Sequence, residues 1–318
     1  RRDRREDLMP FEKTEKIWMD GELVPWDEAK VHILTHSLHY GSGVFEGIRA
    51  YSTERGPAVF RLMDHLQRLE RSAGVYFMEL PYSAEELRQA THELIGANGL
   101  DTCYIRPLAF RGYGELGINP LTCPVDVMIA VWPWGAYLGE EALDKGVRVM
   151  TSSWRRIGQN TLPAAAKASG QYLNSQLAKM EAMHSGYDEA ILLNEGGYLA
   201  DGSGENVFVV RDGVLTTPPT TASCLPGITR DTVIRIARSM DFEVREVDVV
   251  RTDLYNADEV FFTGTAAEIT PIHSVDDHIV GAGPITKRIQ TEFFSITAGT
   301  SELSAEYMDY PAATPAKA

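Results

Sequence analysis

The chain of 318 residues has a net charge of −15, with 44% hydrophobic and 24% charged residues. Its length and composition predict a globular protein of about two domains. The acidic balance excludes a dominant basic surface, so we expect neither a nucleic-acid nor a membrane partner. Three scattered cysteines without a Cys-x-x-Cys pair favour a reducing compartment, the cytoplasm, and no cysteine-based metal site.

The first half of the chain predicts one α+β domain. Asp20-Gly21 lies between two apolar runs, which is typical of a hairpin turn. Ser83 and Glu86 form a capping box, which marks the start of a helix. Apolar periodicity predicts a hairpin over 17–26, strands over 44–51, 58–61, 104–110 and 125–132, and helices over 62–76 and 83–98.

The pattern restarts after residue 139. We expect strands over 147–151, 189–193, 198–210 with an interruption at 201–204, 243–247 and 259–262, and helices over 169–185, 230–240 and 284–298. The predicted organisation is a small α+β domain over 1–133 with residues 1–10 disordered, a linker over 134–139, a larger domain over 140–310 and a flexible tail over 311–318. No Gly-x-Gly-x-x-Gly follows the first strand, so a Rossmann nucleotide fold is not expected.

Lys167 is isolated among small side chains, with no other charged residue from Gly158 to Ala178. Small neighbours leave room for a flat ligand beside the amine. Lysine is the side chain that forms a Schiff base with a carbonyl group. Alanine and lysine are also ordinary helix formers, so the pattern alone fits both a catalytic and a structural lysine.

Glu205 stands just before the apolar run Val207–Val210. A carboxylate entering a buried strand is costly unless it meets a cation. A salt bridge would satisfy it, and so would the protonated ring nitrogen of pyridoxal phosphate, which needs a carboxylate partner.

Two further segments fit a phosphate group. Ile228 and Thr229 lie at the predicted start of a helix, where backbone N–H groups and the helix dipole favour an anion. Thr265 and Ala266 follow a strand in a Gly-Thr-Ala-Ala turn, which could add contacts to the same group. The alternatives are a Thr-capped helix and a plain turn.

On the substrate side, Tyr104 and Arg106 are two residues apart and point the same way along one predicted strand. Together they could hold a carboxylate, with bidentate contacts from the arginine. Arg68 lies one turn after Asp64, which also fits an ion pair on a solvated helix face. The histidines have no convincing metal-ligand spacing beyond His32 and His36.

From Ile17 to Phe294 the chain resembles the bacterial branched-chain amino acid aminotransferases, which are class IV, fold-type IV pyridoxal phosphate enzymes. The motifs that carry the resemblance are HYGSGVFEGIRAY (39–51), FRLMDHLQRL (60–69), YIRPLAF (104–110), GELGINP (114–120), PWGAYLG (133–139), AAAKASGQY (164–172), DGSGENVF (201–208), LPGITRD (225–231) and FTGTAAEITP (262–271). The resemblance implies a two-domain architecture whose larger domain binds the cofactor around a β-barrel-like core.

The resemblance also assigns roles to the cofactor side. It implies that Lys167 is the Schiff-base lysine and proton shuttle, that Glu205 pairs with the pyridine nitrogen, and that Tyr172 bonds the phenolic oxygen. Leu225 would pack on the ring. The phosphate would be held by Arg68, Ile228, Thr229 and Thr265.

On the substrate side, Tyr104 and the amides of Thr265 and Ala266 would take the α-carboxylate, and Arg106 the distal carboxylate of glutamate. The apolar pocket would be walled by Tyr40, Phe45, Trp134, Tyr137 and Tyr172. Leu116, Gly117 and Ile118 would lie on the interdomain loop, with Ile118 reaching the neighbouring subunit of a homodimer. A trimer of dimers is the larger alternative.

The implied reaction is the reversible transfer of the amino group of leucine, isoleucine or valine to 2-oxoglutarate. Three alternatives stay open. The same fold serves D-amino acid and (R)-amine aminotransferases, although Tyr-x-Arg over 104–106 argues against them. Aminodeoxychorismate lyase shares the lysine and glutamate but needs no apolar pocket. A non-enzymatic carrier of pyridoxal phosphate would tolerate the loss of Lys167 or Glu205, and both are present.

Overall fold

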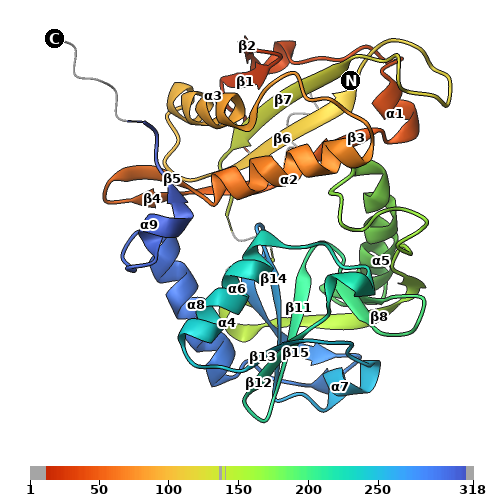
Figure 1. Ribbon diagram of the computed structural model, residues 1–318. Helices are drawn as coiled ribbons and strands as arrows, with labels where there is room; N and C mark the ends of the chain where they lie inside the picture. The colour runs from red at the N-terminus through yellow and green to blue at the C-terminus, as the bar shows by residue number, and fades with distance from the viewer. Residues whose placement is uncertain (1–11, 136–137, 140, 313–318) are drawn as a thin grey trace. The chain divides into compact units, whose positions relative to one another are not determined.

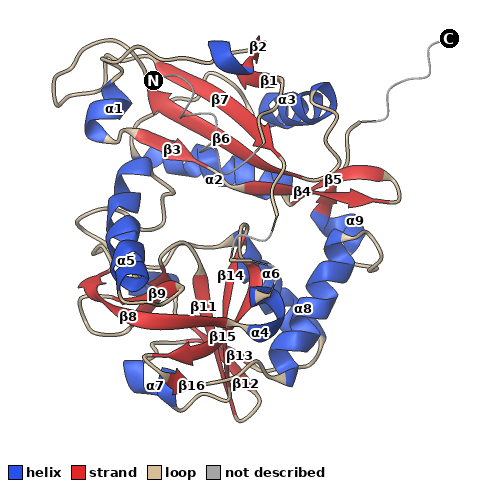
Figure 2. Cartoon of the chain, turned by 180° about the vertical axis from the view of Figure 1, so that it is seen from behind, coloured by secondary structure: helices blue, strands red, loops and turns tan. Residues whose placement is uncertain are grey.

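The computed structural model describes residues 12–135, 138–139 and 141–312. The chain forms two compact units, one containing the residues up to Trp134 and those from Thr297 onward, the other Gly135–Ile296. Each unit combines helices with a sheet (Figure 2), which confirms the α+β prediction. The second unit ends at Ile296, whereas the predicted larger domain ended at residue 310. Residues 297–310 belong with the first unit, because the strand near the C-terminus pairs with a strand there.

The first unit is built on an antiparallel sheet. Its elements are β1 (Lys16–Met19), β2 (Glu22–Pro25), η2 (Trp26–Glu28), α1 (His36–Tyr40), β3 (Gly43–Phe45), β4 (Ile48–Thr53), β5 (Gly56–Phe60), α2 (Leu62–Val75), α3 (Ala84–Ala97), β6 (Cys103–Arg111), β7 (Val125–Trp132), α9 (Ser304–Tyr307) and β17 (Met308–Asp309). The strand order is β17-β5-β4-β6-β7-β1-β2, with β3 beside β6. Helices α2 and α3 lie along one face of this sheet (Figure 1).

Local sequence explains several of these elements. Asp20 and Gly21 have φ of 46° and 95°, the left-handed values that the predicted hairpin turn requires. Helix α3 begins with the predicted capping box, in which Ser83 and Glu86 hydrogen-bond each other's backbone N–H groups. Helix α2 buries Leu62, Leu66 and Leu69 on one face, as its periodicity predicts.

The second unit contains a mixed sheet. Its elements are α4 (Ala142–Lys145), β8 (Val147–Arg155), η3 (Ser169–Gln171), α5 (Tyr172–His184), β9 (Glu189–Leu193), β10 (Leu199–Gly202), β11 (Asn206–Arg211), β12 (Val214–Thr217), η4 (Thr220–Ala222), α6 (Ile228–Ser239), β13 (Val244–Glu246), α7 (Arg251–Tyr255), β14 (Glu259–Gly264), β15 (Glu268–Val275), β16 (His278–Ile279) and α8 (Pro284–Thr297). The strand order is β10-β9-β8-β15-β14-β11-β12-β13, with β16 beside β15. Strand β8 is parallel to both of its neighbours, and the other pairs are antiparallel except β12 with β13.

The core of the second unit forms around β11 and β14, whose residues are almost all buried. The rings of Phe208 and Phe261 stack with centroids 5.1 Å apart. The break in the predicted strand 198–210 falls at residues 203–205, between β10 and β11, and so lies slightly later than the predicted interruption at 201–204. This turn carries Glu205, so the packed strands on either side fix where its backbone lies.

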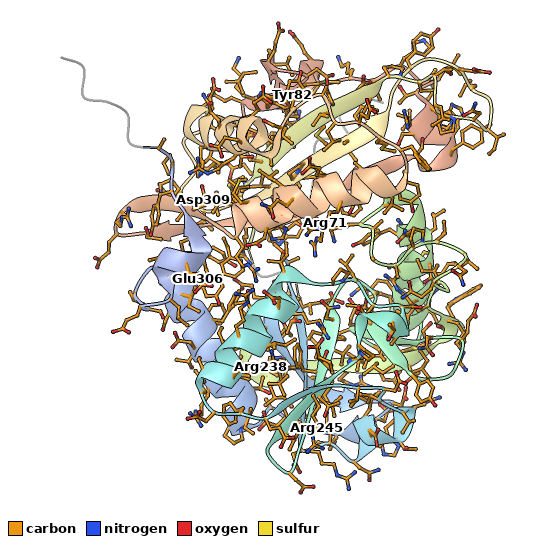
Figure 3. All side chains as sticks on the ribbon, viewed as in Figure 1. Arg71, Tyr82, Arg238, Arg245, Glu306 and Asp309 are labelled. Carbon is orange, nitrogen blue, oxygen red and sulfur yellow. The ribbon has the colours of Figure 1, made fainter. Side chains whose placement is uncertain are left out.

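The C-terminal strand is held to the first unit by charged side chains. Asp309, labelled in Figure 3, accepts hydrogen bonds from Nε of Arg88 at 2.8 Å and from Nε2 of His92 at 2.6 Å. Both donors lie on α3, so this ion-paired cluster fastens β17 to α3, while the backbone of β17 pairs with β5. Within the part of the chain that the structure describes, no helix is long and apolar enough to cross a membrane.

Candidate active site

Lys167 and Tyr172 lie together in the second unit. Lys167 precedes η3, and Tyr172 is the first residue of α5. The Nζ of Lys167 donates a hydrogen bond of 2.7 Å to the hydroxyl of Tyr172. Ala164, Ala166 and Ala168 around the lysine are buried. The amine thus lies next to a phenol, in a segment whose alanines are buried, and not on an ordinary helix surface.

Glu205 is a buried carboxylate in the turn between β10 and β11, with 6% of its surface exposed. Burial raises its pKa to about 8, and the negative charge of Glu189 adds to this shift. The N–H of Gly204 donates to its Oε2 at 3.0 Å, and Lys179 also favours the ionised form, but neither offsets the burial. A carboxylate in this setting favours a cationic partner.

Gly202 preserves the space that this carboxylate occupies. A Cβ atom at Gly202 would lie 2.8 Å from Oε2 of Glu205 and 2.7 Å from the ring of Phe262. Both distances are shorter than real Cβ contacts, so a larger residue would displace the carboxylate. The Asp-Gly-Ser-Gly-Glu turn is therefore shaped by the position of Glu205.

Helix α6 begins at Ile228, directly after Leu225-Pro226-Gly227. Its N-cap is Gly227, which has no side chain, so the Thr-capped alternative is wrong. The first-turn residues Ile228 and Thr229 are buried, at 7% and 3% exposure. The start of this twelve-residue helix has the polarity that favours an anion.

Thr265 and Ala266 occupy the turn between β14 and β15, and both are half-buried. Gly264, which precedes them, lies near Glu205, because a Cβ atom there would be 3.7 Å from Cγ of Glu205. The Gly-Thr-Ala turn and the Glu205 turn are thus adjacent in the second unit. The structure brings together two segments that are about sixty residues apart in sequence.

In the first unit, Arg106 lies among aromatic rings. Its guanidinium is 4.8 Å from the ring centroid of Phe45 and 5.4 Å from that of Tyr104. Its Nη2 donates to the hydroxyl of Tyr104 at 3.4 Å, which confirms that the two side chains share one face of β6. The rings of Trp132 and Trp134 each lie 5.2 Å from that of Tyr104. An arginine held this way offers a charge inside an apolar environment.

Arg68 is not on a solvated helix face, so that alternative is wrong. It is 5% exposed, and its Nε and Nη2 each donate to one oxygen of Glu46 at 2.8 Å. Nδ1 of His65 lies 2.7 Å from the same carboxylate. Burial alone would raise the pKa of Glu46, but Arg68 and then His65 outweigh it and lower the pKa well below its ordinary range. Asp64 pairs instead with Arg61, at 2.9 Å.

The loop around Ile118 is anchored to α1 within the first unit. The hydroxyl of Tyr40 donates to the carbonyl of Leu116 at 3.0 Å, and Nε2 of His36 lies 3.0 Å from the carbonyl oxygen of Gly117. Ile118 itself is 83% exposed. Tyr137, expected in the substrate pocket, lies outside the described residues.

Several residues of these groups escaped the sequence interpretation. Glu46, His65 and Trp132 supply the surroundings of Arg68 and Arg106. Glu46 had a detectable signal, because it is a lone carboxylate in the otherwise apolar run Val44–Ile48. The other two carry no such signal, since histidine on a helix and tryptophan in a strand are ordinary core residues.

The sequence model of the family Amino-transferase class IV matches residues 43–275, and the chain belongs to this family. Among its relatives, the branched-chain-amino-acid aminotransferase of Escherichia coli (strain K12) is 51% identical over 305 residues, covering 95% of this chain and 99% of the relative. The family resemblance inferred from the motifs is thereby confirmed.

Solved structures agree with the sequence comparison. The crystal structure of the Escherichia coli branched-chain amino acid aminotransferase superposes with a TM-score of 0.92 at 50% identity, covering 94% of this chain and all of that one. The branched-chain amino acid aminotransferase from Thermobaculum terrenum in its PLP-form has a TM-score of 0.87 at 39% identity, covering 93% of this chain and 97% of that one. The fold expected from the resemblance is therefore confirmed.

Proposed function

We propose that this aminotransferase uses pyridoxal 5'-phosphate to transfer the amino group of leucine, isoleucine or valine reversibly to 2-oxoglutarate. The products are the branched-chain 2-oxo acids and L-glutamate. The observation that carries the substrate choice is the guanidinium of Arg106 held between Phe45 and Tyr104. One pocket must accept both an apolar side chain and the carboxylate of glutamate. Aromatic walls suit the first, and a single arginine suits the second.

The residues of the second unit fit pyridoxal phosphate. Glu205 is buried and its raised pKa reflects the cost of a charge without a strong cation, which a protonated pyridine nitrogen would offset. The Nζ of Lys167 and the hydroxyl oxygen of Tyr172 are 2.7 Å apart. Such closeness suits the cofactor, whose aldehyde carbon and phenolic oxygen stand on neighbouring ring atoms. When bound, the cofactor supplies an electron sink for the carbanion formed at the substrate α-carbon.

The remaining cofactor contacts follow the same assignment. Leu225 would pack on one face of the ring. The N–H groups of Ile228 and Thr229 at the start of α6 would bind the phosphate, together with Thr265. Arg68, whose guanidinium Glu46 holds by two hydrogen bonds, would add a charge to the same phosphate.

Lys167 performs the proton transfer. Its amine would hold the cofactor covalently and, once released by the substrate amine, would act as a base. As that base, Lys167 would remove the proton from the substrate α-carbon and return it in the later step of the transfer. Tyr172 keeps the amine in position through its hydroxyl. Glu205 would hold the proton on the ring nitrogen of the bound cofactor.

The family resemblance also assigns the substrate contacts. Tyr104 and the amides of Thr265 and Ala266 take the α-carboxylate, and Arg106 takes the distal carboxylate of glutamate. When an apolar chain is present, Arg106 keeps its contacts with Phe45 and Tyr104. We assign the walls of the apolar pocket to Tyr40, Phe45, Trp134 and Tyr172, whereas Tyr137, also predicted there, lies outside the described residues.

We also infer a homodimer, with a trimer of dimers as the larger assembly. Ile118 is 83% exposed at the tip of an anchored loop, which suits insertion into a neighbouring subunit. Val31, Ile33 and Leu38 are also exposed apolar side chains of the first unit. Cys103, Cys123 and Cys224 are free thiols, which fits a cytoplasmic enzyme.

A substrate panel tests the function. The purified protein should be yellow, and leucine with 2-oxoglutarate should yield glutamate faster than D-alanine or 1-phenylethylamine reacts. A colourless protein that takes up no added pyridoxal phosphate would refute the cofactor assignment. Faster turnover of D-alanine or 1-phenylethylamine would favour the D-amino acid or (R)-amine aminotransferases instead.

A further inference from the structure

Leu225 is held by side chains on both of its backbone polar groups. It lies between η4 and α6, outside regular secondary structure. Its N–H donates to Oδ2 of Asp201 at 2.9 Å, and its carbonyl accepts from Nδ2 of Asn206 at 2.8 Å. Backbone groups in such a segment have no sheet or helix ladder to satisfy them. The side chains of Asp201 and Asn206 therefore satisfy the backbone N–H and carbonyl groups of Leu225.

The two side chains are also joined to each other. Nδ2 of Asn206 donates to Oδ1 of Asp201 at 2.8 Å, so each carboxylate oxygen has a donor. Both residues are buried, with 4% and 6% of their surface exposed. Arg156 is 3.8 Å from Asp201 and donates to the carbonyl of Ser223 at 3.3 Å. Burial raises the pKa of Asp201 to about 6, and Arg156, which also holds the Leu225 segment, opposes this shift only in part.

The fit of this segment against Asn206 is close. A Cβ atom at Gly227 would lie 1.9 Å from Oδ1 of Asn206, which no side chain could accommodate without moving the loop. Gly227 is the N-cap of α6. The position of Asn206 therefore determines where the chain passes between Leu225 and the helix.

Asp201 and Asn206 stand at the two ends of the turn that carries Glu205. The N–H of Gly202 donates to the carbonyl of Glu205 at 2.7 Å, which closes this turn. A single turn thus carries the buried carboxylate and, at its ends, the two side chains that hold Leu225. Movement of the Leu225 segment relative to Glu205 requires these hydrogen bonds to break.

We propose that Asp201 and Asn206 are positioning residues that hold Leu225 and the start of α6 at a fixed place relative to Glu205. This inference rests on the proposed function, in which Leu225 packs on the cofactor ring and α6 binds its phosphate. Neither residue touches the reacting atoms. Their loss should weaken cofactor binding through the loop and leave Lys167 able to act once the cofactor is bound.

The experiment compares Asn206→Ala and Asp201→Asn with the wild-type full-length chain. Each variant loses at least one hydrogen bond of the network around Leu225, and a hydrogen bond is worth about 1 kcal/mol, or roughly a fivefold to tenfold change in affinity. We expect the Kd for pyridoxal 5'-phosphate to rise about fivefold or more. The visible circular dichroism of the bound cofactor should change, whereas the leucine KM at saturating cofactor should stay within about twofold.

Thr151→Val is the matched control, because Thr151 Oγ1 donates to Oδ2 of Asp276 in a partly buried pair of the same unit. It should lower the unfolding temperature without changing the cofactor Kd. The inference is overturned if both variants bind the cofactor within twofold of wild type, or if Thr151→Val weakens binding equally. Failure of the wild-type protein to bind pyridoxal 5'-phosphate would instead overturn the proposed function. If Asn206→Ala does not fold, Asp201→Asn alone decides between the outcomes.

Discussion

The Nζ of Lys167 donates a hydrogen bond of 2.7 Å to the hydroxyl of Tyr172. The lysine stands before a short 3-10 turn, and the tyrosine opens the helix that follows it. The backbone of this turn therefore sets the distance between the amine and the phenol. Because both groups are assigned to neighbouring atoms of one cofactor, the pair can be tested one side chain at a time.

Lys167→Ala should abolish the covalent link to the cofactor and lower kcat for leucine by at least about a thousandfold, within the range of general acid–base groups. Borohydride should attach the cofactor covalently to the wild-type chain and leave the variant unlabelled in the mass spectrum. Lys287→Ala is the control lysine, since Lys287 pairs with Asp144 on the surface. Labelling of Lys167→Ala would contradict the assignment.

Tyr172→Phe should keep the label and lower kcat about tenfold, the value of one hydrogen bond.

Glu205 should make the cofactor-free protein less stable as the pH rises. Its pKa in the folded chain is about 8, well above the ordinary 4.5, because of burial. The folded state then binds more protons than the unfolded state between these pH values, so the free energy of unfolding falls as pH rises through this window. Glu205→Gln should remove the contribution of Glu205 to this slope and make the cofactor-free protein more stable than wild type at pH 8.

Urea unfolding of both cofactor-free proteins at pH 5 and pH 8 checks this. At pH 5 the two free energies of unfolding should nearly agree, because Glu205 is then protonated in the folded state. If the difference in the free energy of unfolding between wild type and Glu205→Gln were the same at both pH values, the raised pKa would be contradicted. With the cofactor present at pH 8, the advantage of Glu205→Gln in the free energy of unfolding should shrink or reverse. The ionised carboxylate of the wild type then has the protonated ring nitrogen as its cation.

Local features of the fold were predictable because their causes are close in sequence. The Asp20-Gly21 turn and the Ser83–Glu86 capping box each depend on residues within a few positions. The lone charge of Lys167 and the carboxylate of Glu205 were visible for the same reason. Their surroundings are apolar in the sequence itself.

Partnerships across long separations were not predictable from the residues. Arg68 binds Glu46 from 22 positions away, and Asp201 holds Leu225 from 24 positions away. The nearest acidic residue on the same helix face, Asp64, suggested a different pair for Arg68. Tertiary packing decides such contacts, because a helix and a strand must first be placed side by side. The return of the C-terminal strand to the first unit was missed for the same reason.

Arg106 should separate the two kinds of substrate. Arg106→Leu removes the charge for the distal carboxylate of glutamate and 2-oxoglutarate but keeps apolar bulk against Phe45. A hydrogen-bonded charge contributes about 1.5–3 kcal/mol, so kcat/KM for glutamate should fall roughly tenfold to a hundredfold. The value for leucine in the first half-reaction should change by less than about threefold.

Single-turnover kinetics with glutamate and with leucine separately measures how far each amino acid is affected, because the second substrate is then absent. Arg106→Lys keeps the charge but loses the planar contact with the rings, and it should recover part of the glutamate activity. An equal loss for leucine and glutamate would mean that Arg106 has a general structural role. It would not fit selective recognition of the distal carboxylate.

Glu46 should stabilise the first unit through its buried ion pair with Arg68. Its carboxylate is fully buried and accepts two hydrogen bonds from Arg68. Glu46→Gln leaves the arginine charge buried without its partner carboxylate, which costs about 3–5 kcal/mol. Asp64→Asn is the matched control on the same helix. It breaks a pair whose carboxylate is half exposed, 49% at the side chain, and should cost at most about 1 kcal/mol.

The pH dependence of this stability has a definite sign. Because Arg68 and His65 lower the pKa of Glu46 in the folded chain, its contribution is fully present above the ordinary pKa of 4.5 and is lost as pH falls below it. Chemical unfolding at pH 7 and pH 4 should therefore show a smaller difference between wild type and Glu46→Gln at the lower pH. A difference that grows on acidification, or a loss in Asp64→Asn equal to that in Glu46→Gln, would contradict the buried ion pair.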